Sequence, residues 1–223
     1  MLDLGKDAEG APVCGSFRHE QFIGLARRAK TRKLCGFVNP VGAIIGEYSG
    51  KVYAPVMFVA EAPGRLGACV THTPLSGDAT GNNFHKLLDV AGLTNLEYFV
   101  TNAVLCNPVT AKGTNSWPTT MHIKNCYPFL EETISVIEPT LVVALGTVAL
   151  RALNYIEHHE LSLPNSVGKI VPWFKRHLTC LYNRSPLAMK RRTWKKQCED
   201  YKILSMFIST FITGTHLGFL ALC

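Results

Sequence analysis

The feature that most constrains how this chain folds is a short apolar run, Val56–Ala60, with no polar residue inside it. A strand with one solvated face alternates apolar and polar residues, so a continuous run predicts a strand buried on both faces, as in a parallel sheet. Leu141–Leu145 repeats the pattern. Helical periodicity follows the two runs, at Asn82–Ala91 and Val148–Ile156, and strands that alternate with helices predict an α/β domain.

Polar side chains stand where the first two expected strands end. Glu61 comes directly after Val56–Ala60, and Asn102 directly after the strand expected at Tyr98–Thr101. Ligands of open α/β sheets bind just beyond the carboxyl ends of the strands. We therefore expect Glu61 and Asn102 to point into one crevice.

The net charge of +7 favours a polyanionic partner, because clustered Lys and Arg side chains attract phosphates and release their counterions. The basic residues form two groups: Arg27, Arg28, Lys30, Arg32 and Lys33, and then Lys190, Arg191, Arg192, Lys195 and Lys196. The first group lies in Phe17–Lys33, which has the spacing of an amphipathic helix. Solvated helix faces remain the alternative interpretation.

The chain divides into three expected parts: an N-terminal segment with the basic helix at 1–34, the α/β domain at 35–202 and an apolar tail at 203–223. The first residues lack the pattern of a secretory signal, so we expect a cytoplasmic protein. The tail has no formally charged side chain and approaches membrane-spanning length. Polar residues interrupt it, and we expect a final core helix rather than a membrane anchor.

Eight cysteines in a reducing compartment are expected to be thiols or metal ligands rather than disulfides. Cys35 follows the basic helix, Cys106 follows the second expected strand, and Cys126 lies in the amphipathic stretch Met121–Ile137. Four thiolates would hold an iron–sulfur cluster, and the same residue type would hold zinc. Buried thiols without metal are the third possibility.

Five motifs together give the chain a specific resemblance. They are Glu61-Ala62-Pro63-Gly64, Gly77-Asp78-Ala79-Thr80-Gly81, Thr101-Asn102 followed by Cys106, Leu145-Gly146, and Tyr182-Asn183-Arg184-Ser185-Pro186. In this order the chain resembles the iron–sulfur uracil-DNA glycosylases of families 4 and 5, over about residues 31–202. The resemblance implies a three-layer α/β/α domain with a short, mainly parallel central sheet and a 4Fe-4S cluster. It also implies hydrolysis of the N-glycosidic bond of deoxyuridine in DNA, which leaves an abasic site after the base is flipped out.

The resemblance also implies roles for individual residues. Asn102 would read uracil, because its amide can donate to a carbonyl oxygen and accept from N3–H. Glu61 and Asp78 would position water and stabilise a cationic sugar, with Asn183 as the third catalytic residue. Without the resemblance, the sequence favours a purely structural interpretation, in which Glu61 is an exposed turn carboxylate and Asp78 is a helix N-cap. The other residues expected to contact the substrate are Ala62, Pro63, Gly64 and Leu75.

Residues 183–192 match the segment that lies along the minor groove and penetrates the duplex. The implied DNA-binding residues are Arg184, Ser185, Leu187, Lys190, Arg191 and Arg192. The implied cluster ligands are Cys14, Cys35, Cys106 and Cys126. We expect uracil-containing DNA as the partner, no obligate protein partner, and a monomer.

The chain departs from the family pattern at three positions. Asn183 stands where a His is usual, and Leu75 stands where a Phe that stacks on the base is usual. Arg32 stands three residues before Cys35, where the family has a cysteine, and Cys14 is the nearest replacement.

Two rival functions follow from the sequence. The altered residues at positions 183 and 75 motivate a non-catalytic or very slow binder of uracil or lesion DNA. A redox or small-ligand α/β protein is the third hypothesis, although neither GxxxxGK[ST] nor GxGxxG occurs in the chain.

Overall fold

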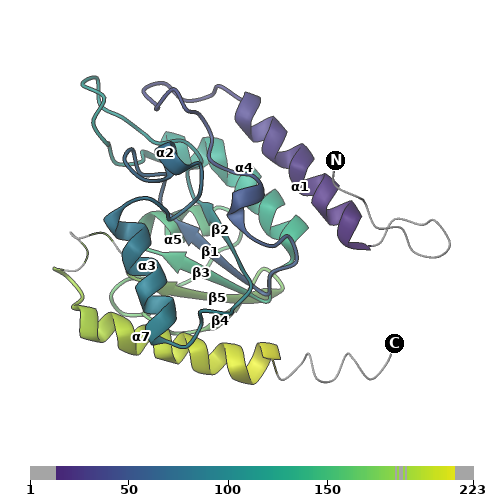
Figure 1. The fold of residues 1–223 in the computed structure, drawn as a ribbon, viewed down its shortest axis with the longest axis vertical. Helices are drawn as coiled ribbons and strands as arrows, with labels where there is room; N and C mark the ends of the chain where they lie inside the picture. Colours follow the sequence, from purple (N-terminus) through teal and green to yellow (C-terminus); the bar gives the residue numbers. More distant parts are fainter. Residues whose placement is uncertain (1–13, 184, 186–187, 189, 214–223) are drawn as a thin grey trace.

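A five-stranded sheet forms the centre of the molecule in the computed structural model, which describes residues 14–183, 185, 188 and 190–213 (Figure 1). The strands are β1 Val56–Ala60, β2 Tyr98–Asn102, β3 Leu141–Leu145, β4 Val171–Trp173 and β5 Arg176–Leu181. Their order is β2-β1-β3-β5-β4, and only β4 runs antiparallel to its neighbour. The predicted short, mainly parallel sheet is confirmed.

Helices cover both faces of the sheet (Figure 1). Their bounds are α1 Cys14–Thr31, α2 Ala68–Thr71, α3 Ala79–Val90, α4 Thr120–Ile137, α5 Thr147–Leu153 and α7 Trp194–Phe207, with the short helices η1 Glu47–Ser49 and η2 Ile208–Thr213. The helices α1, α4 and α5 contribute to one buried cluster and α3 and α7 to the other. These are the three layers that the family resemblance implies.

The two-sided burial of β1 explains its unbroken apolar sequence. Successive side chains of a strand point to opposite faces. Met57 belongs to the cluster under α1, α4 and α5, whereas Phe58 belongs to the cluster under α3 and α7. The Phe58 ring meets the Phe84 ring of α3 edge to face, with their centroids 5.0 Å apart. A polar residue at any position of this strand would therefore be buried.

The helix α1 packs into the same layered structure. Phe22 of α1 is buried and meets Phe99 of β2 edge to face, with ring centroids 5.2 Å apart. Arg18 and Arg28 of α1 form ion pairs with Glu138 and Glu132. The N-terminal segment was predicted to end at residue 34, just after α1. The buried side chains of α1 belong to the same hydrophobic core as the sheet.

The helix α7 begins within the second basic group, at Trp194. Thr193 caps it, accepting a hydrogen bond from the Lys196 backbone N–H, so Lys190, Arg191 and Arg192 precede the helix. In the part of the chain that the structure describes, no helix is both long and apolar enough to cross a membrane. Residues 214–223 of the predicted tail lie outside the described residues.

Candidate functional site

The loops after the parallel strands bring Glu61 and Asn102 to adjacent strand ends. Ala60 of β1 pairs with Asn102 of β2 in the parallel register. The pairing continues beyond the strands, because the Ala103 N–H donates to the Ala60 carbonyl at 2.8 Å and the Val104 N–H donates to the Glu61 carbonyl at 3.0 Å. The backbones of Glu61 and Asn102, 41 positions apart in the sequence, thus lie at the ends of neighbouring strands.

The amide of Asn102 is buried, and its Nδ2 has no hydrogen-bond partner among the described residues. A buried amide nitrogen without a partner costs about 1–3 kcal/mol. Such a group is a candidate for binding a ligand that supplies the missing acceptor. A pyrimidine carbonyl oxygen is an acceptor of this kind.

Glu61, directly after the neighbouring strand β1, carries a partly buried carboxyl group. Burial raises the pKa of Glu61 above its ordinary value, because a carboxylate loses hydration there. A carboxylate with a raised pKa is a better proton acceptor. The Glu61 carboxylate is therefore a stronger base than an exposed carboxylate.

A buried asparagine that the sequence interpretation missed supports the Glu61 loop. The Asn107 side-chain Nδ2 donates to the Pro63 carbonyl at 2.8 Å and to Asn115 Oδ1 at 3.1 Å. The partner Pro63 is 44 residues earlier in the chain, so no local sequence signal indicates the contact. Asn107 fixes the position of the turn that carries Glu61.

Asp78 has two structural tasks beside the same turn. Its Oδ1 accepts a hydrogen bond from the Gly81 N–H at 2.9 Å and caps α3. This is the helix N-cap that the structural interpretation of Asp78 expects. Its Oδ2 lies against the turn: a Cβ added at Gly64 or Gly67 would be 2.6 or 2.4 Å from this oxygen. The two glycines thus allow the Asp78 carboxylate to approach the Glu61 loop closely.

Leu75 is held in an unusual backbone conformation near this turn. Its φ is +50°, in the left-handed region that a residue with a bulky side chain seldom adopts. A Cβ added at Gly81 would be 2.3 Å from the Leu75 carbonyl oxygen, so the loop lies directly on the first turn of α3. The half-buried Leu75 side chain packs against the cluster under α3 and α7.

Asn183 lies at the same edge of the sheet, two residues after β5. A Cβ added at Gly146, which follows β3 with φ +99°, would be 3.4 Å from the Asn183 Cβ. The Asn183 Oδ1 accepts a hydrogen bond from the Ser185 N–H at 3.2 Å. The oxygen therefore shapes the loop, and Nδ2 is the end of this amide that can donate to a ligand.

The basic residues near this edge differ in their surroundings. Lys190 and Arg191 are exposed. Arg192 forms a two-fold ion pair with the buried carboxylate of Asp200 and lies over the Tyr182 ring, 5.7 Å from its centroid. Because Asp200 balances its charge, Arg192 anchors the start of α7.

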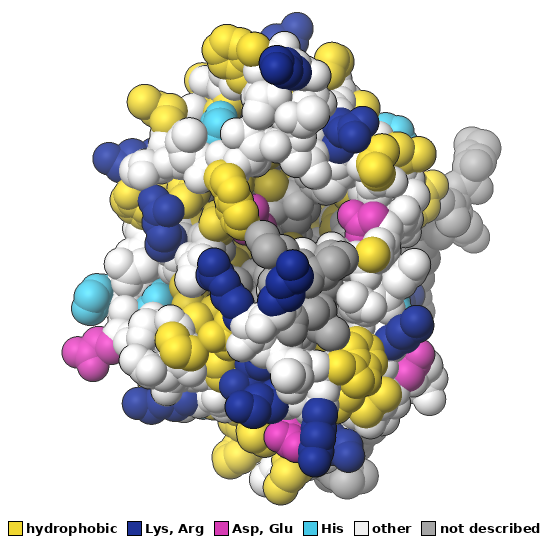
Figure 2. All heavy atoms as spheres, turned by 90° about the vertical axis from the view of Figure 1, so that its left-hand side faces the viewer, with side chains coloured by type: hydrophobic (Ala, Val, Ile, Leu, Met, Phe, Trp, Pro, Cys, Tyr) yellow, Lys and Arg dark blue, Asp and Glu magenta, His cyan; other side chains and the backbone are white. Residues whose placement is uncertain are grey.

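Lys and Arg side chains are spread over the face where the loops after β1 and β5 lie (Figure 2). Ser185 is half-buried, and its Oγ accepts a hydrogen bond from the Ala188 N–H at 3.2 Å. The predicted DNA-binding residues Arg184 and Leu187 lie outside the described residues.

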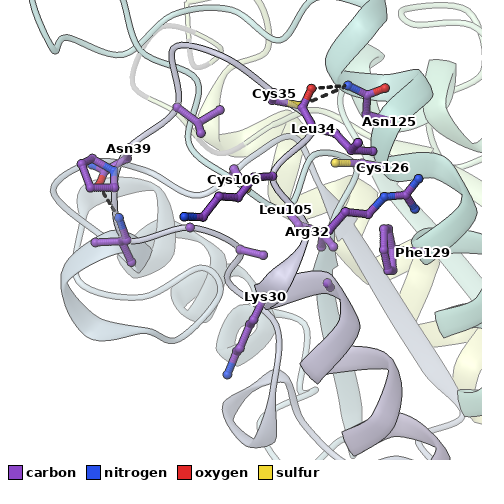
Figure 3. A pocket seen from close by; sticks show the side chains of 17 residues that line it. Lys30, Arg32, Leu34, Cys35, Asn39, Leu105, Cys106, Asn125, Cys126 and Phe129 are labelled. Atoms are coloured by element: carbon purple, nitrogen blue, oxygen red, sulfur yellow. Dashed lines mark hydrogen bonds between the residues drawn. The ribbon is translucent and has the colours of Figure 1, made fainter.

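A second site is formed by three of the four predicted cluster cysteines. Cys35, Cys106 and Cys126 line one cavity of about 420 Å³ between the loop after α1, the segment after β2, and α4 (Figure 3). Asn125 Nδ2 donates to Cys35 Sγ at 3.3 Å. Burial, together with the neighbouring thiols, raises the pKa of Cys106 to about 12.

Cys14 does not fit this group as α1 is folded. It begins α1, whereas Cys35 follows the other end of that helix. An 18-residue helix is about 27 Å long, so the backbone of Cys14 lies far from the three cysteines. The side chain of Cys14 is outside the described part of the structure. The predicted replacement of the fourth ligand by Cys14 is therefore corrected.

The residues around the cavity offer part of a ligand set for a metal group. Three thiols face one space and a side-chain amide donates to one of them, which suits negatively charged thiolates. Among the described residues no three His, Cys, Asp or Glu side chains are arranged to hold a metal ion. The thiols surround a space rather than converge on a point, and they fit three of the four thiolate positions of a cluster.

The fold and the first site define an α/β protein in which a carboxylate and a buried amide, whose nitrogen has no partner among the described residues, follow adjacent strands at the carboxyl edge of a mainly parallel sheet. Comparison with known families gives the same class in more detail. The profile of the uracil DNA glycosylase superfamily matches residues 48–204. The chain belongs to this superfamily.

Individual relatives agree with the family match. A type-5 uracil-DNA glycosylase of Pyrobaculum aerophilum is 33% identical over 47% of this chain and 50% of its own length. A type-4 enzyme of Thermotoga maritima is 28% identical over 70% of this chain and 77% of its own. A type-4 enzyme of Saccharolobus solfataricus is 30% identical, over 57% and 55%. The match thus spans about half of two of these three relatives.

Proposed function

We propose that this protein is a uracil-DNA glycosylase that hydrolyses the N-glycosidic bond of deoxyuridine in DNA and leaves an abasic site for base excision repair. The observation that carries the proposal is the unpaired, buried Asn102 amide on the strand next to the Glu61 loop. The names of the relatives and the family match support the same activity.

Asn102 is the residue that reads the base. Its amide nitrogen donates to a uracil carbonyl oxygen, and its amide oxygen accepts from N3–H. Cytosine carries no hydrogen on N3 and an amino group in place of O4, so it would leave the buried Asn102 amide mismatched. A mismatched buried amide costs about 1–3 kcal/mol, which supplies discrimination.

The carboxylates act on the sugar side of the scissile bond. Cleavage builds positive charge on the sugar and negative charge on the leaving base. Glu61 accepts a proton from the attacking water, and Asp78, held against the same turn, stabilises the cationic sugar. On the other side, the Asn183 amide nitrogen donates to the base oxygen as charge builds there.

The substrate contacts follow from the loops around these groups. Ala62, Pro63 and Gly64 form the turn beneath the base, and Leu75 supplies apolar contact in place of an aromatic ring. Lys190 and Arg191 neutralise phosphates. Arg184, Ser185 and Leu187 belong to the penetrating segment of the proposal, and Arg192 supports that segment through Asp200.

The thiol cavity is proposed to hold an iron–sulfur cluster of the 4Fe-4S type. Cys35, Cys106 and Cys126 would hold it. When bound, the cluster would crosslink the loop after α1, the segment after β2 and α4. The crosslink lies four residues beyond Asn102 and thus steadies the strand end that reads the base. We propose a cytoplasmic monomer whose partner is uracil-containing DNA.

The test is a cleavage assay on two oligonucleotides that differ by one base. A labelled duplex with a single uracil is incubated with the protein and then with alkali, beside a matched duplex with thymine. The proposal predicts alkali-dependent scission at the uracil alone. Salt-sensitive binding of the uracil duplex without scission, at high protein concentration and long times, would contradict the catalytic proposal and leave a uracil-binding protein.

A further inference from the structure

We propose that, within the described part of the chain, Cys35, Cys106 and Cys126 are the only protein ligands of the cluster, and that Arg32 stands where a fourth thiolate would be expected. The inference rests on the cofactor named in the proposed function. It differs from a four-cysteine site in one property that can be measured: one iron of the cluster is open to outside ligands.

The three thiol positions are fixed by the backbone around them. The Ile44 N–H donates to the Leu105 carbonyl at 2.8 Å, and the Asn39 N–H donates to the Asn107 carbonyl at 2.9 Å. These bonds tie the loop that follows Cys35 to the segment that contains Cys106. The third thiol, on Cys126, comes from α4.

No fourth thiol lines the cavity in the described part of the chain. Cys14 begins α1, whose other end borders the cavity, as shown above. Cys69 is buried in α2, and its thiol is near enough to Cys106 to contribute to the raised pKa of that thiol, but it does not line the cavity. Cys180 donates its S–H to the Ser166 carbonyl, and Cys198 packs against the cluster under α3 and α7.

Arg32 occupies the position at which a fourth ligand would be expected. It lines the cavity three residues before Cys35, and its guanidinium lies over the Phe129 ring, 5.2 Å from the centroid (Figure 3). A guanidinium stays protonated in proteins and offers no lone pair, so it cannot coordinate iron. Lys30 and Lys33 also line the cavity. Three basic residues therefore line the cavity, and the thiolates of a bound cluster would be negative; the Lys30 ammonium itself points toward Gly46, away from the thiols (Figure 3).

An iron without a protein thiolate is held only by the sulfides of the cluster and by an outside ligand such as water or a small thiol. A chelator can remove it as Fe²⁺. A 4Fe-4S core of charge 2+ then becomes a neutral 3Fe-4S core, so charge and electrons balance without an oxidant. A thiolate at position 32 would close this site.

The experiment compares the wild-type protein with Arg32→Cys, and Arg32→Ser serves as the matched control because it differs from the cysteine by one atom. All three are purified without oxygen. Iron and sulfide are measured per chain before and after treatment with an Fe²⁺ chelator. Wild type and Arg32→Ser are expected to lose about one iron in four and keep their sulfide, whereas Arg32→Cys keeps all of its iron.

Two further variants test the ligand set. Cys126→Ser is expected to lose most iron and sulfide, and Cys14→Ser is expected to keep both. Absence of iron from the wild type, equal iron release from wild type and Arg32→Cys, or loss of the cluster in Cys14→Ser would overturn the proposal. Because the readout is iron and sulfide, failure here is distinguishable from failure of uracil excision, which is assayed on DNA.

Discussion

The contact between Asn107 and the Pro63 carbonyl gives a quantitative prediction about the site. Replacement of Asn107 by alanine removes two hydrogen bonds and leaves the Pro63 carbonyl unpaired in a buried position. Each net hydrogen bond contributes about 1 kcal/mol and an unpaired buried carbonyl costs about 1–3 kcal/mol. The Asn107 Oδ1 is itself without a partner among the described residues, so its removal offsets part of the loss. We expect a net destabilisation of about 1–3 kcal/mol.

The assay is urea unfolding followed by circular dichroism, with Asn115→Ala as the control. Asn115 is exposed and loses only the single bond to Asn107, so its replacement should cost at most about 1 kcal/mol. The Asn107 variant should also excise uracil more slowly, because the turn that carries Glu61 is no longer fixed. An Asn107→Ala protein with wild-type stability and wild-type rate would refute the positioning role.

Four other predictions concern Glu61, Asn183 and Gly67. The kcat/KM for uracil excision should decrease as pH is lowered, with a midpoint above the ordinary carboxyl pKa. Glu61→Gln should excise uracil about 10²–10⁴-fold more slowly and should no longer show this decrease at low pH. Because the folded state raises the Glu61 pKa, wild-type stability should decrease as pH rises from the ordinary to the raised pKa; an unchanged pH dependence of unfolding in Glu61→Gln would contradict this. Asn183→His should raise the excision rate by up to ~10², measured under single turnover, and slower excision would show that position 183 lies outside the pocket. Gly67→Ala should destabilise the fold by about 1–3 kcal/mol in urea, since its Cβ would meet Asp78 Oδ2 at 2.4 Å; wild-type stability would contradict that close approach.

The strands β1 and β3 were predictable because each is buried on both faces and has a continuous apolar sequence. The edge strand β4 escaped prediction for the opposite reason. It has only three residues, one of them Pro172, and it is partly exposed at the margin of the sheet. Proline is tolerated on an edge strand because one side of the strand needs no hydrogen-bond donor. Sequence periodicity has no signal for so short an element.

The adjacency of Glu61 and Asn102 was predictable because parallel strands end at one edge of the sheet. The roles of Arg192 and Asn107 were not, because both depend on partners that the pattern does not reveal. Asp200 neutralises Arg192 from the next helix, and Pro63 accepts from Asn107 across 44 residues. Cys14 failed as a cluster ligand because α1 extends back to that residue and places it at the far end.

The most direct test of the account is single-turnover release of uracil by the wild type and by Asn102→Ala, with binding to abasic-site DNA measured on the same samples. If the unpaired Asn102 amide reads the base, the variant should release uracil at least ~10²-fold more slowly and still bind the abasic product with salt-sensitive affinity. Release at the wild-type rate by Asn102→Ala would show that the carboxyl ends of β1 and β2 do not form the uracil site.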